Sequence, residues 1–226
     1  MEKKNKEDYK VDEQNKIYIV GGRGVGKTTF LYQIHSGTFN DNLPPSEIGI
    51  AKFEYKKGHK VFTIKDLTDD DNFSSTNTLK NELEDVILVI VLFAINDLKS
   101  FEYAKILIQF IKNNIINNNE MHIFLLGNKY DLGEADPNEI KVKKRDVDQY
   151  IYNIDNLHYF DISCKTNHNI SKIKDIIDNI EIEEEKDEDD GKIPEEERKM
   201  KDVKAANEAS NKLKVIMEEI KNMTPP

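Results

Sequence analysis

Cysteine is nearly absent from the sequence, which limits the compartments where the protein can work. Cys164 is the only one, so no intrachain disulfide can form. Because disulfides are typical of oxidising compartments, we expect a reducing, cytoplasmic location. The amino-terminal residues carry no apolar signal region, and position 2 is Glu2 rather than the glycine that N-myristoylation requires.

Long apolar runs and an excess of positive charge are also missing. The longest apolar run, residues 86–95, is about half of what a membrane-spanning helix needs, so we expect no transmembrane segment. The formal net charge is −10, and residues 181–197 supply −9 of it with eleven acids and two bases. The rest of the chain is close to neutral and has no dominant basic patch, which argues against a nucleic-acid partner.

Strand-like and helix-like segments alternate between residues 16 and 180, the pattern of an α/β fold. Residues 50–55 and 60–65 predict a β-hairpin with Gly58 in its turn. We therefore expect a six-stranded, mostly parallel sheet with helices on both faces. Further strands are predicted at 16–20, 86–93, 122–127 and 158–162, and helices at 29–35, 100–116, 145–154 and 169–180.

Three segments flank this region. Residues 1–15 are polar and predicted to be disordered, residues 181–197 form an acidic linker, and residues 198–226 predict an amphipathic helical tail. We expect the apolar stripe of the tail to bind a partner helix or a second copy of itself. The alternatives are a solvated helix that frays and a helix that folds back on its own domain. The stripe consists of Ala206, Ala209, Leu213, Ile216, Ile220 and Met223, at three- and four-residue steps.

A glycine-rich loop follows the first predicted strand. It reads Gly21-Gly22-Arg23-Gly24-Val25-Gly26-Lys27-Thr28, the G-x-x-x-x-G-K-T pattern of phosphate-binding loops. Glycines let backbone N–H groups surround phosphate oxygens, and the next helix adds partial positive charge at its amino terminus. Lys27 can reach the β- and γ-phosphates, and the Thr28 hydroxyl can bind Mg²⁺. The candidate phosphate-binding residues are Gly21, Arg23, Gly24, Val25, Gly26, Lys27, Thr28 and Thr29.

Two more motifs follow predicted strands. Asn128-Lys129-Tyr130-Asp131 comes after the strand at 122–127, and Ser163-Cys164-Lys165 comes after the strand at 158–162. Ligands of parallel sheets bind beyond the carboxyl ends of the strands, so all three loops should open on one crevice. The order and spacing of the three motifs over residues 16–180 resemble the Ras superfamily of small GTP-binding proteins, and residues 94–101 and the segment Ile48-Gly49 resemble its Rab branch.

The resemblance implies that guanine is the base and that the cofactors are GTP or GDP with Mg²⁺. Asp131 would accept hydrogen bonds from guanine N1 and the 2-amino group, which adenine lacks, so an ATP-using enzyme is disfavoured. Asn128 would contact the base and brace its loop, and Ser163 would hold Asp131. The other implied contacts are Lys129 and Lys165 on the faces of the base, the Cys164 backbone N–H on the guanine carbonyl, and Phe39 at the edge of the base.

The hydrolytic side departs from the family pattern. Where the family has Asp-x-x-Gly-Gln, this chain reads Asp66-Leu67-Thr68-Asp69-Asp70. Asp66 can still hold Mg²⁺ through a water, but Asp69 and Asp70 replace the glycine that senses the γ-phosphate and the glutamine that positions the attacking water. Two like charges about 4 Å apart repel by roughly 4 kcal/mol at an effective dielectric near 20, so these aspartates beside a γ-phosphate would weaken GTP binding. Because the glutamine is replaced, we expect slow or impaired hydrolysis.

Two more positions bear on catalysis. Arg23 stands where bulk crowds the hydrolytic site; a built-in arginine finger is the weaker alternative, because reach from within the loop is poor. The family also uses a hydroxyl that contacts Mg²⁺. Counting without gaps from Thr28 gives Ser46, whereas alignment on Ile48 gives Glu47.

The resemblance also sets an expectation for localisation and partners. The chain ends at Pro226 without the terminal cysteines that Rab and Ras proteins use for prenylation, so we expect no lipid anchor of that kind. The sequence thus predicts a Rab-like GTP-binding protein that acts through an effector or scaffold protein. The alternative is a pseudo-GTPase that serves as a structural adaptor.

Overall fold

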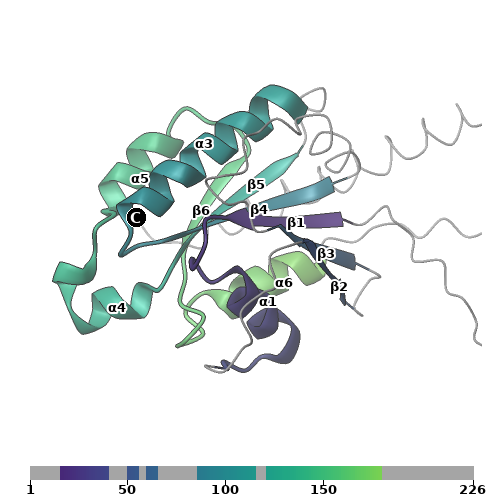
Figure 1. Ribbon diagram of the computed structural model, residues 1–226, viewed down its shortest axis with the longest axis horizontal. Helices are drawn as coiled ribbons and strands as arrows, with labels where there is room; N and C mark the ends of the chain where they lie inside the picture. The colour runs from purple at the N-terminus through teal and green to yellow at the C-terminus, as the bar shows by residue number, and fades with distance from the viewer. Residues whose placement is uncertain (1–15, 41–49, 56–59, 66–85, 116–120, 180–226) are drawn as a thin grey trace, which may run out of the picture.

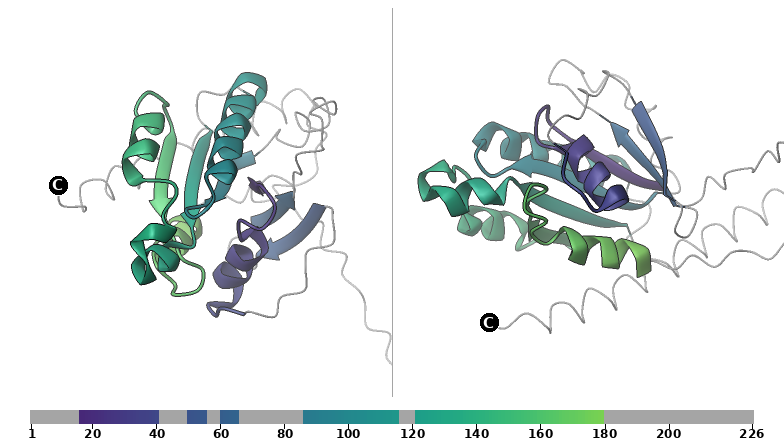
Figure 2. Two further views of the ribbon diagram at one scale, coloured as in Figure 1. Left: turned by 60° about the vertical axis from the view of Figure 1, so that its left-hand side comes forward. Right: turned by 90° about the horizontal axis from the view of Figure 1, so that it is seen from below.

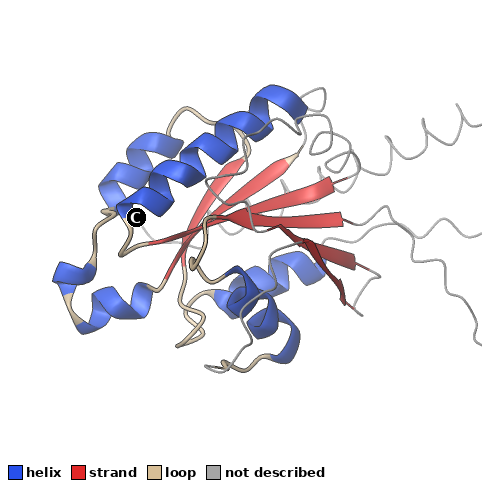
Figure 3. Cartoon of the chain, viewed as in Figure 1, coloured by secondary structure: helices blue, strands red, loops and turns tan. Residues whose placement is uncertain are grey.

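The computed structural model describes residues 16–40, 50–55, 60–65, 86–115 and 121–179. These residues form one twisted sheet with helices on both sides (Figure 1; Figure 3). The strands are β1 (Lys16–Gly21), β2 (Ile50–Tyr55), β3 (Lys60–Lys65), β4 (Val86–Ala94), β5 (His122–Asn128) and β6 (Leu157–Asp161). The helices are α1 (Lys27–Ser36), α3 (Leu98–Ile115), α4 (Tyr130–Ala135), the 3₁₀ helix η2 (Pro137–Glu139), α5 (Lys144–Ile151) and α6 (Ile170–Asn179).

The sheet has the strand order β2-β3-β1-β4-β5-β6. β2 and β3 pair antiparallel, and the other neighbouring strands pair parallel. Gly21, Leu92, Leu126 and Phe160 lie in one row across β1, β4, β5 and β6. Because these strands are parallel and in register, the loops that follow them leave from the same edge of the sheet. The predicted α/β class, with a parallel sheet and helices, is confirmed.

The central strand β4 explains why the sheet needs cover on both faces. Its residues alternate between two buried clusters: Leu88, Ile90 and Leu92 face one side, and Val89 and Val91 face the other. Residues 88–93 are 0% exposed, as expected of an apolar strand without polar alternation. In Figure 2, α1 and α6 cover the first side, and α3 and α5 cover the second.

The covering helices present their apolar residues at helical spacing. In α6 the buried residues are Ile170, Ile173, Ile176 and Ile177. Each such side chain contributes about 1.5–3 kcal/mol by leaving water. The predicted inward face of α3 is confirmed, because its members are all buried. They are Phe101, Ala104, Leu107, Ile108 and Ile111.

Several predicted boundaries differ from those observed. α1 begins at Lys27 rather than Thr29, because left-handed Gly26 ends the loop and caps the helix. α5 ends at Ile151 rather than 154, where the chain turns toward β6. The short helices α4 and η2 were not predicted, since six and three residues are too few to show a helical period.

Some predictions lie outside the described residues. They are the disordered segment 1–15, the hairpin turn at Gly58, the linker 181–197 and the tail 198–226. Among the described helices, none combines the length and apolar character that crossing a bilayer requires.

Candidate functional site

The loop between β1 and α1 folds around the side chain of Lys27. Its ammonium donates hydrogen bonds to the backbone carbonyls of Gly21, at 2.9 Å, and Gly22, at 2.8 Å. Lys27 is only 5% exposed, and a buried ammonium needs such acceptors. These bonds hold the positive charge inside the loop, at the amino terminus of α1. Backbone N–H groups and the helix dipole favour an anion at the same place.

Two glycines of this loop adopt left-handed conformations that other residues rarely adopt. Gly24 has φ +75° and Gly26 has φ +100°. At Gly26 the packing is restrictive as well, because a Cβ atom there would run into Nδ2 of Asn128. A Cβ atom at Gly24 would meet nothing within 4 Å. Conformation alone therefore requires glycine at position 24, whereas conformation and packing together require it at position 26.

Asn128 joins three loops at the edge of the sheet. It ends β5 and is 3% exposed. Its Nδ2 donates to the Val25 carbonyl of the first loop at 2.9 Å, and its Oδ1 accepts from the Cys164 N–H of the third loop at 3.2 Å. The bracing predicted for Asn128 is present. The Cys164 N–H, predicted to meet the guanine carbonyl, instead donates to Asn128 in this structure.

The carboxylate of Asp131 is held by the loop after β6. Ser163 Oγ donates to Asp131 Oδ1 at 2.6 Å and accepts from the Thr166 N–H at 3.1 Å. Ser163 is completely buried, so its hydroxyl has one fixed environment. The predicted contact between Ser163 and Asp131 is therefore present. It places the carboxylate in the first turn of α4, two residues beyond left-handed Lys129 at φ +69°.

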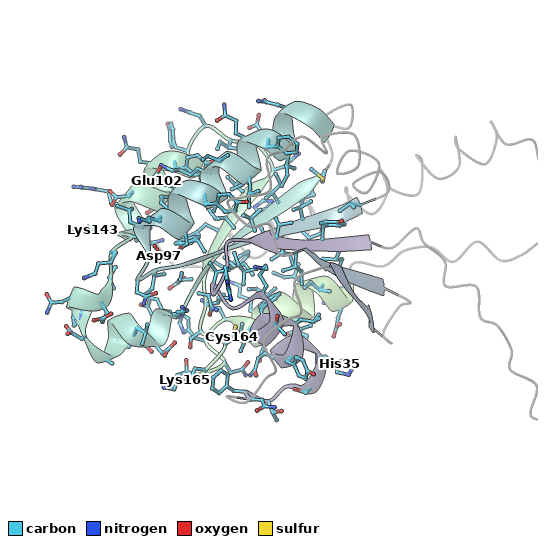
Figure 4. The ribbon with its side chains drawn as sticks, viewed as in Figure 1. His35, Asp97, Glu102, Lys143, Cys164 and Lys165 are labelled. Atoms are coloured by element: carbon cyan, nitrogen blue, oxygen red, sulfur yellow. The ribbon has the colours of Figure 1, made fainter. Side chains whose placement is uncertain are left out.

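The thiol of Cys164 is not a candidate nucleophile. Its pKa is raised to about 12, chiefly by burial and also by the nearby charge of Asp131, against the opposite effect of a hydrogen bond with Asn128. The buried thiol therefore stays protonated at neutral pH. Figure 4 shows Cys164 inside the fold and Lys165 at its margin, on the loop that leads into α6.

The arrangement combines a loop suited to phosphates with a carboxylate suited to a base. The model of the Ras family matches residues 16–181. The chain belongs to the Ras family. It is similar to Protein ras-1 of Neurospora crassa, with 27% identity over 181 residues that cover 78% of this chain and 81% of ras-1. The site is therefore that of a GTP-binding protein of the Ras family.

The remaining predicted Ras-family positions divide into two groups. Thr28 and Thr29 lie partly buried in the first turn of α1, and Arg23 is exposed in the loop before it. Phe39 packs against the buried cluster beneath α1 and α6. Asp66 and Ser46, with the alternative Glu47, lie outside the described residues, as do Asp69 and Asp70.

The Ras-family motifs did not reveal every residue that shapes the site. Gln33 on α1 donates to Asn167 Oδ1 at 3.3 Å, which ties the helix behind the phosphate loop to the loop after β6. Asn167 and Asn169 have φ +64° and +55°. Asparagine tolerates this left-handed conformation, so the sequence Asn167-His168-Asn169 was the available signal for a tightly turned loop.

Proposed function

We propose that the protein is a Rab-like small GTP-binding protein with slow or impaired hydrolysis that acts through partner proteins. The bridge made by Asn128 carries the proposal. It holds a phosphate-type loop and the loops around Asp131 at one edge of the sheet, and binding both ends of one nucleotide requires this arrangement.

The proposed roles follow from the chemistry of the side chains. The Lys27 ammonium and the N–H groups of the loop neutralise and orient the phosphates. The Asp131 carboxylate accepts from guanine N1 and the 2-amino group. Oxygen donors suit Mg²⁺, which would balance phosphate charge when bound. Thr28 supplies one hydroxyl in the described part of the chain, and Asp66 and Ser46 complete the proposed set.

Calorimetry with GDP and ADP on the purified chain tests the proposal. We expect a clear preference for GDP, because adenine has no donor for Asp131 at the position of the 2-amino group. Equal affinities, or no binding of either nucleotide, would refute guanine-nucleotide binding at this site.

Slow hydrolysis is proposed from Asp69 and Asp70 in the sequence. Single-turnover GTP hydrolysis should be no faster than about 10⁻⁴ s⁻¹, the order of the intrinsic rate of Ras. Replacing Asp69→Gly and Asp70→Gln together should raise the affinity for GTP relative to GDP, because two carboxylates no longer face the γ-phosphate. A wild-type rate near 1 s⁻¹ would contradict the proposal.

The assignment to the Rab branch is proposed from the sequence stretch 94–101, which includes the turn after β4. There the Ser100 hydroxyl donates to the Asp97 carbonyl at 2.7 Å and accepts from the Ala94 N–H at 3.0 Å. These residues belong to the Rab-like stretch 94–101, so the turn that the stretch encodes is closed by its own serine. The assignment and a cytoplasmic location remain proposals.

The second candidate function is a pseudo-GTPase that serves as a structural adaptor. Asp69 and Asp70 favour it, since they remove the residues that sense and hydrolyse the γ-phosphate. Nucleotide content after purification, followed by exchange against labelled GDP, separates the two. Exchangeable nucleotide supports the switch, whereas permanently bound or absent nucleotide supports the adaptor.

Partner binding is proposed to use the apolar stripe within residues 206–223. Replacing Leu213, Ile216 and Ile220 with Asp should abolish partner capture or change the oligomer size, because charges cannot enter an apolar interface. The matched control places three aspartates outside the stripe, at Asn207, Ser210 and Asn211. If partners, oligomer size and cellular distribution are the same in all variants, the stripe is not a docking surface.

A further inference from the structure

An aromatic contact joins the loop after β5, which holds Asp131, to the loop after β6, which holds Ser163; these are called the two base loops below. One of its two rings, that of His168, lies outside the motifs. The rings of Tyr130 and His168 are stacked, with centroids 4.6 Å apart and planes inclined by 11°. Tyr130 stands directly before Asp131, and His168 lies five residues after Ser163. The stack is therefore a second connection between loops that the hydrogen bond from Ser163 to Asp131 already joins.

The His168 side of the stack is anchored by several contacts. The His168 carbonyl accepts from the Ser163 N–H at 3.2 Å. Its Nε2 lies 3.5 Å from Asp161 Oδ2 and 3.1 Å from Asn169 Nδ2. Asn169 Nδ2 in turn donates to the Asp161 carbonyl at 2.8 Å. The ring is about one third exposed, yet these contacts give it one orientation against the end of β6.

The Tyr130 side is anchored through its backbone. The Tyr130 N–H donates to the Ile162 carbonyl at 3.0 Å, and the residue begins α4. The ring also packs against the buried cluster on the α3 and α5 side. Two fixed rings thus meet between the loops, one of them on the residue next to Asp131.

We propose that Tyr130 and His168 are a positioning pair that sets the Asp131 carboxylate and so determines how strictly the site demands the 2-amino group of guanine. The inference rests on the guanine-nucleotide binding proposed above. Ser163 fixes one oxygen of the carboxylate, but a carboxylate held at one atom can still pivot about it. The stack restrains the adjacent residue and removes that freedom. Neither ring needs to touch the base.

The experiment compares GDP with inosine diphosphate (IDP), which lacks the 2-amino group, by calorimetry on the full chain. His168→Ala should weaken GDP binding about two- to tenfold, the range that an aromatic pair is worth. IDP binding should change much less, because IDP makes no 2-amino contact with Asp131. The preference for GDP over IDP should therefore shrink. If the stack has only a structural role, His168→Ala should weaken the binding of GDP and IDP equally and leave the preference for GDP unchanged.

Two further variants separate the ring from its polar edge. His168→Phe keeps a ring and loses the contact with Asp161, so it should retain the preference for GDP. His168→Gln keeps a polar end without a ring, so it should lose the preference as His168→Ala does. Adding Tyr130→Ala to His168→Ala should reduce the preference for GDP over IDP little further, because each substitution removes the same stack. The matched control is His35→Ala, since His35 lies at the end of α1 away from the phosphate loop (Figure 4).

The outcomes distinguish this inference from the function on which it rests. A wild-type chain that does not prefer GDP to ADP overturns the proposed function. A wild-type chain that prefers GDP, with an unchanged preference over IDP in His168→Ala, overturns the positioning pair alone. The positioning pair is also overturned if His168→Gln retains the preference for GDP over IDP and His168→Phe loses it, because the polar contact would then determine the preference. Thermal unfolding without nucleotide checks the fold, and the Gln variant replaces the Ala variant if the latter does not fold.

Discussion

The phosphate loop and the two base loops are built in different ways, although they meet at one edge of the sheet. The phosphate loop is shaped by its backbone: Gly24 and Gly26 adopt left-handed conformations, and Lys27 bonds to two carbonyls of the loop. The base loops are shaped by side chains, among them the contact of Ser163 with Asp131 and the stack on His168. Asn128 is the side chain that bonds to both.

The difference follows from what each part has to recognise. Phosphate oxygens are alike in every nucleotide, so backbone N–H groups are sufficient donors and only the path of the chain has to be fixed. A base is recognised by the direction of particular donors and acceptors, so a side chain such as that of Asp131 has to be oriented. Substitutions in the first region should therefore change binding of all nucleotides, and those in the second should change selectivity.

The largest effect is expected from the phosphate side. Lys27→Ala removes a buried charge that is proposed to bind the phosphates, and charge-assisted hydrogen bonds contribute roughly 1.5–3 kcal/mol each. GDP affinity measured by calorimetry should fall at least about 100-fold, and residual binding of GDP and ADP should become similar. Lys99→Ala, at an exposed lysine of α3, is the matched control. A loss below tenfold would show that the backbone of the loop suffices.

The two left-handed glycines test whether the regions depend on each other. Gly26→Ala and Gly24→Ala both introduce strain of about 1–2 kcal/mol, but only the first also displaces Asn128. Loss of a buried hydrogen-bond partner adds roughly 1–3 kcal/mol. Denaturant unfolding should show that Gly26→Ala destabilises the protein about 2 kcal/mol more than Gly24→Ala. Equal destabilisation would mean that the bond from Asn128 to the phosphate loop contributes little.

A smaller and more selective effect is expected at Ser163. Ser163→Ala removes the hydroxyl that donates to Asp131 at 2.6 Å. GDP affinity should fall about tenfold, while the weak affinity for ADP should stay the same, because adenine does not use the carboxylate in this way. Ser36→Ala at the end of α1 is the control. An equal loss for both nucleotides would place the effect in the stability of the loop rather than in recognition of the base.

The smallest predicted effect is a loss of stability at acidic pH. It arises in β6, the strand that precedes the loop of Ser163. Burial lowers the pKa of His158 on β6 to about 4, from an ordinary value near 6.5. The unfolded chain therefore binds the proton more readily, so stability is complete above about pH 6.5 and decreases as the pH falls toward 4. His158 Nε2 also lies 3.0 Å from His122 Nδ1, a hydrogen bond that needs one of the two nitrogens to accept.

Denaturant unfolding at pH 7.5 and 5.5 measures this effect. The wild type should lose about 1 kcal/mol between the two values, and His158→Gln should lose less. His35→Gln, at an exposed histidine, should behave as the wild type does. β1, which precedes the phosphate loop, contains no histidine. A fall in pH should therefore destabilise the part of the sheet next to the guanine-side loops first. An identical pH dependence in both variants would refute the role of His158.

The sequence predicted those parts of the molecule whose chemistry repeats at a fixed spacing. The strand β4 could be predicted because burial on both faces produces a continuous apolar run, and α3 because burial on one face imposes a helical period. The contact between Ser163 and Asp131 could be predicted because both residues belong to motifs. The stack of Tyr130 on His168 could not, because it depends on how two loops of irregular backbone approach each other. For the same reason the sequence did not reveal the bond between Gln33 and Asn167.

The double bond made by Asn128 has a consequence for how a nucleotide leaves. Because one amide bonds to Val25 at the phosphate end and to Cys164 at the base end, a rotation of this side chain breaks both connections at once. A protein that promotes exchange could therefore act from either end, without reaching the phosphates themselves. Release would then show a single kinetic barrier that Asn128→Ala lowers equally for GDP and GTP.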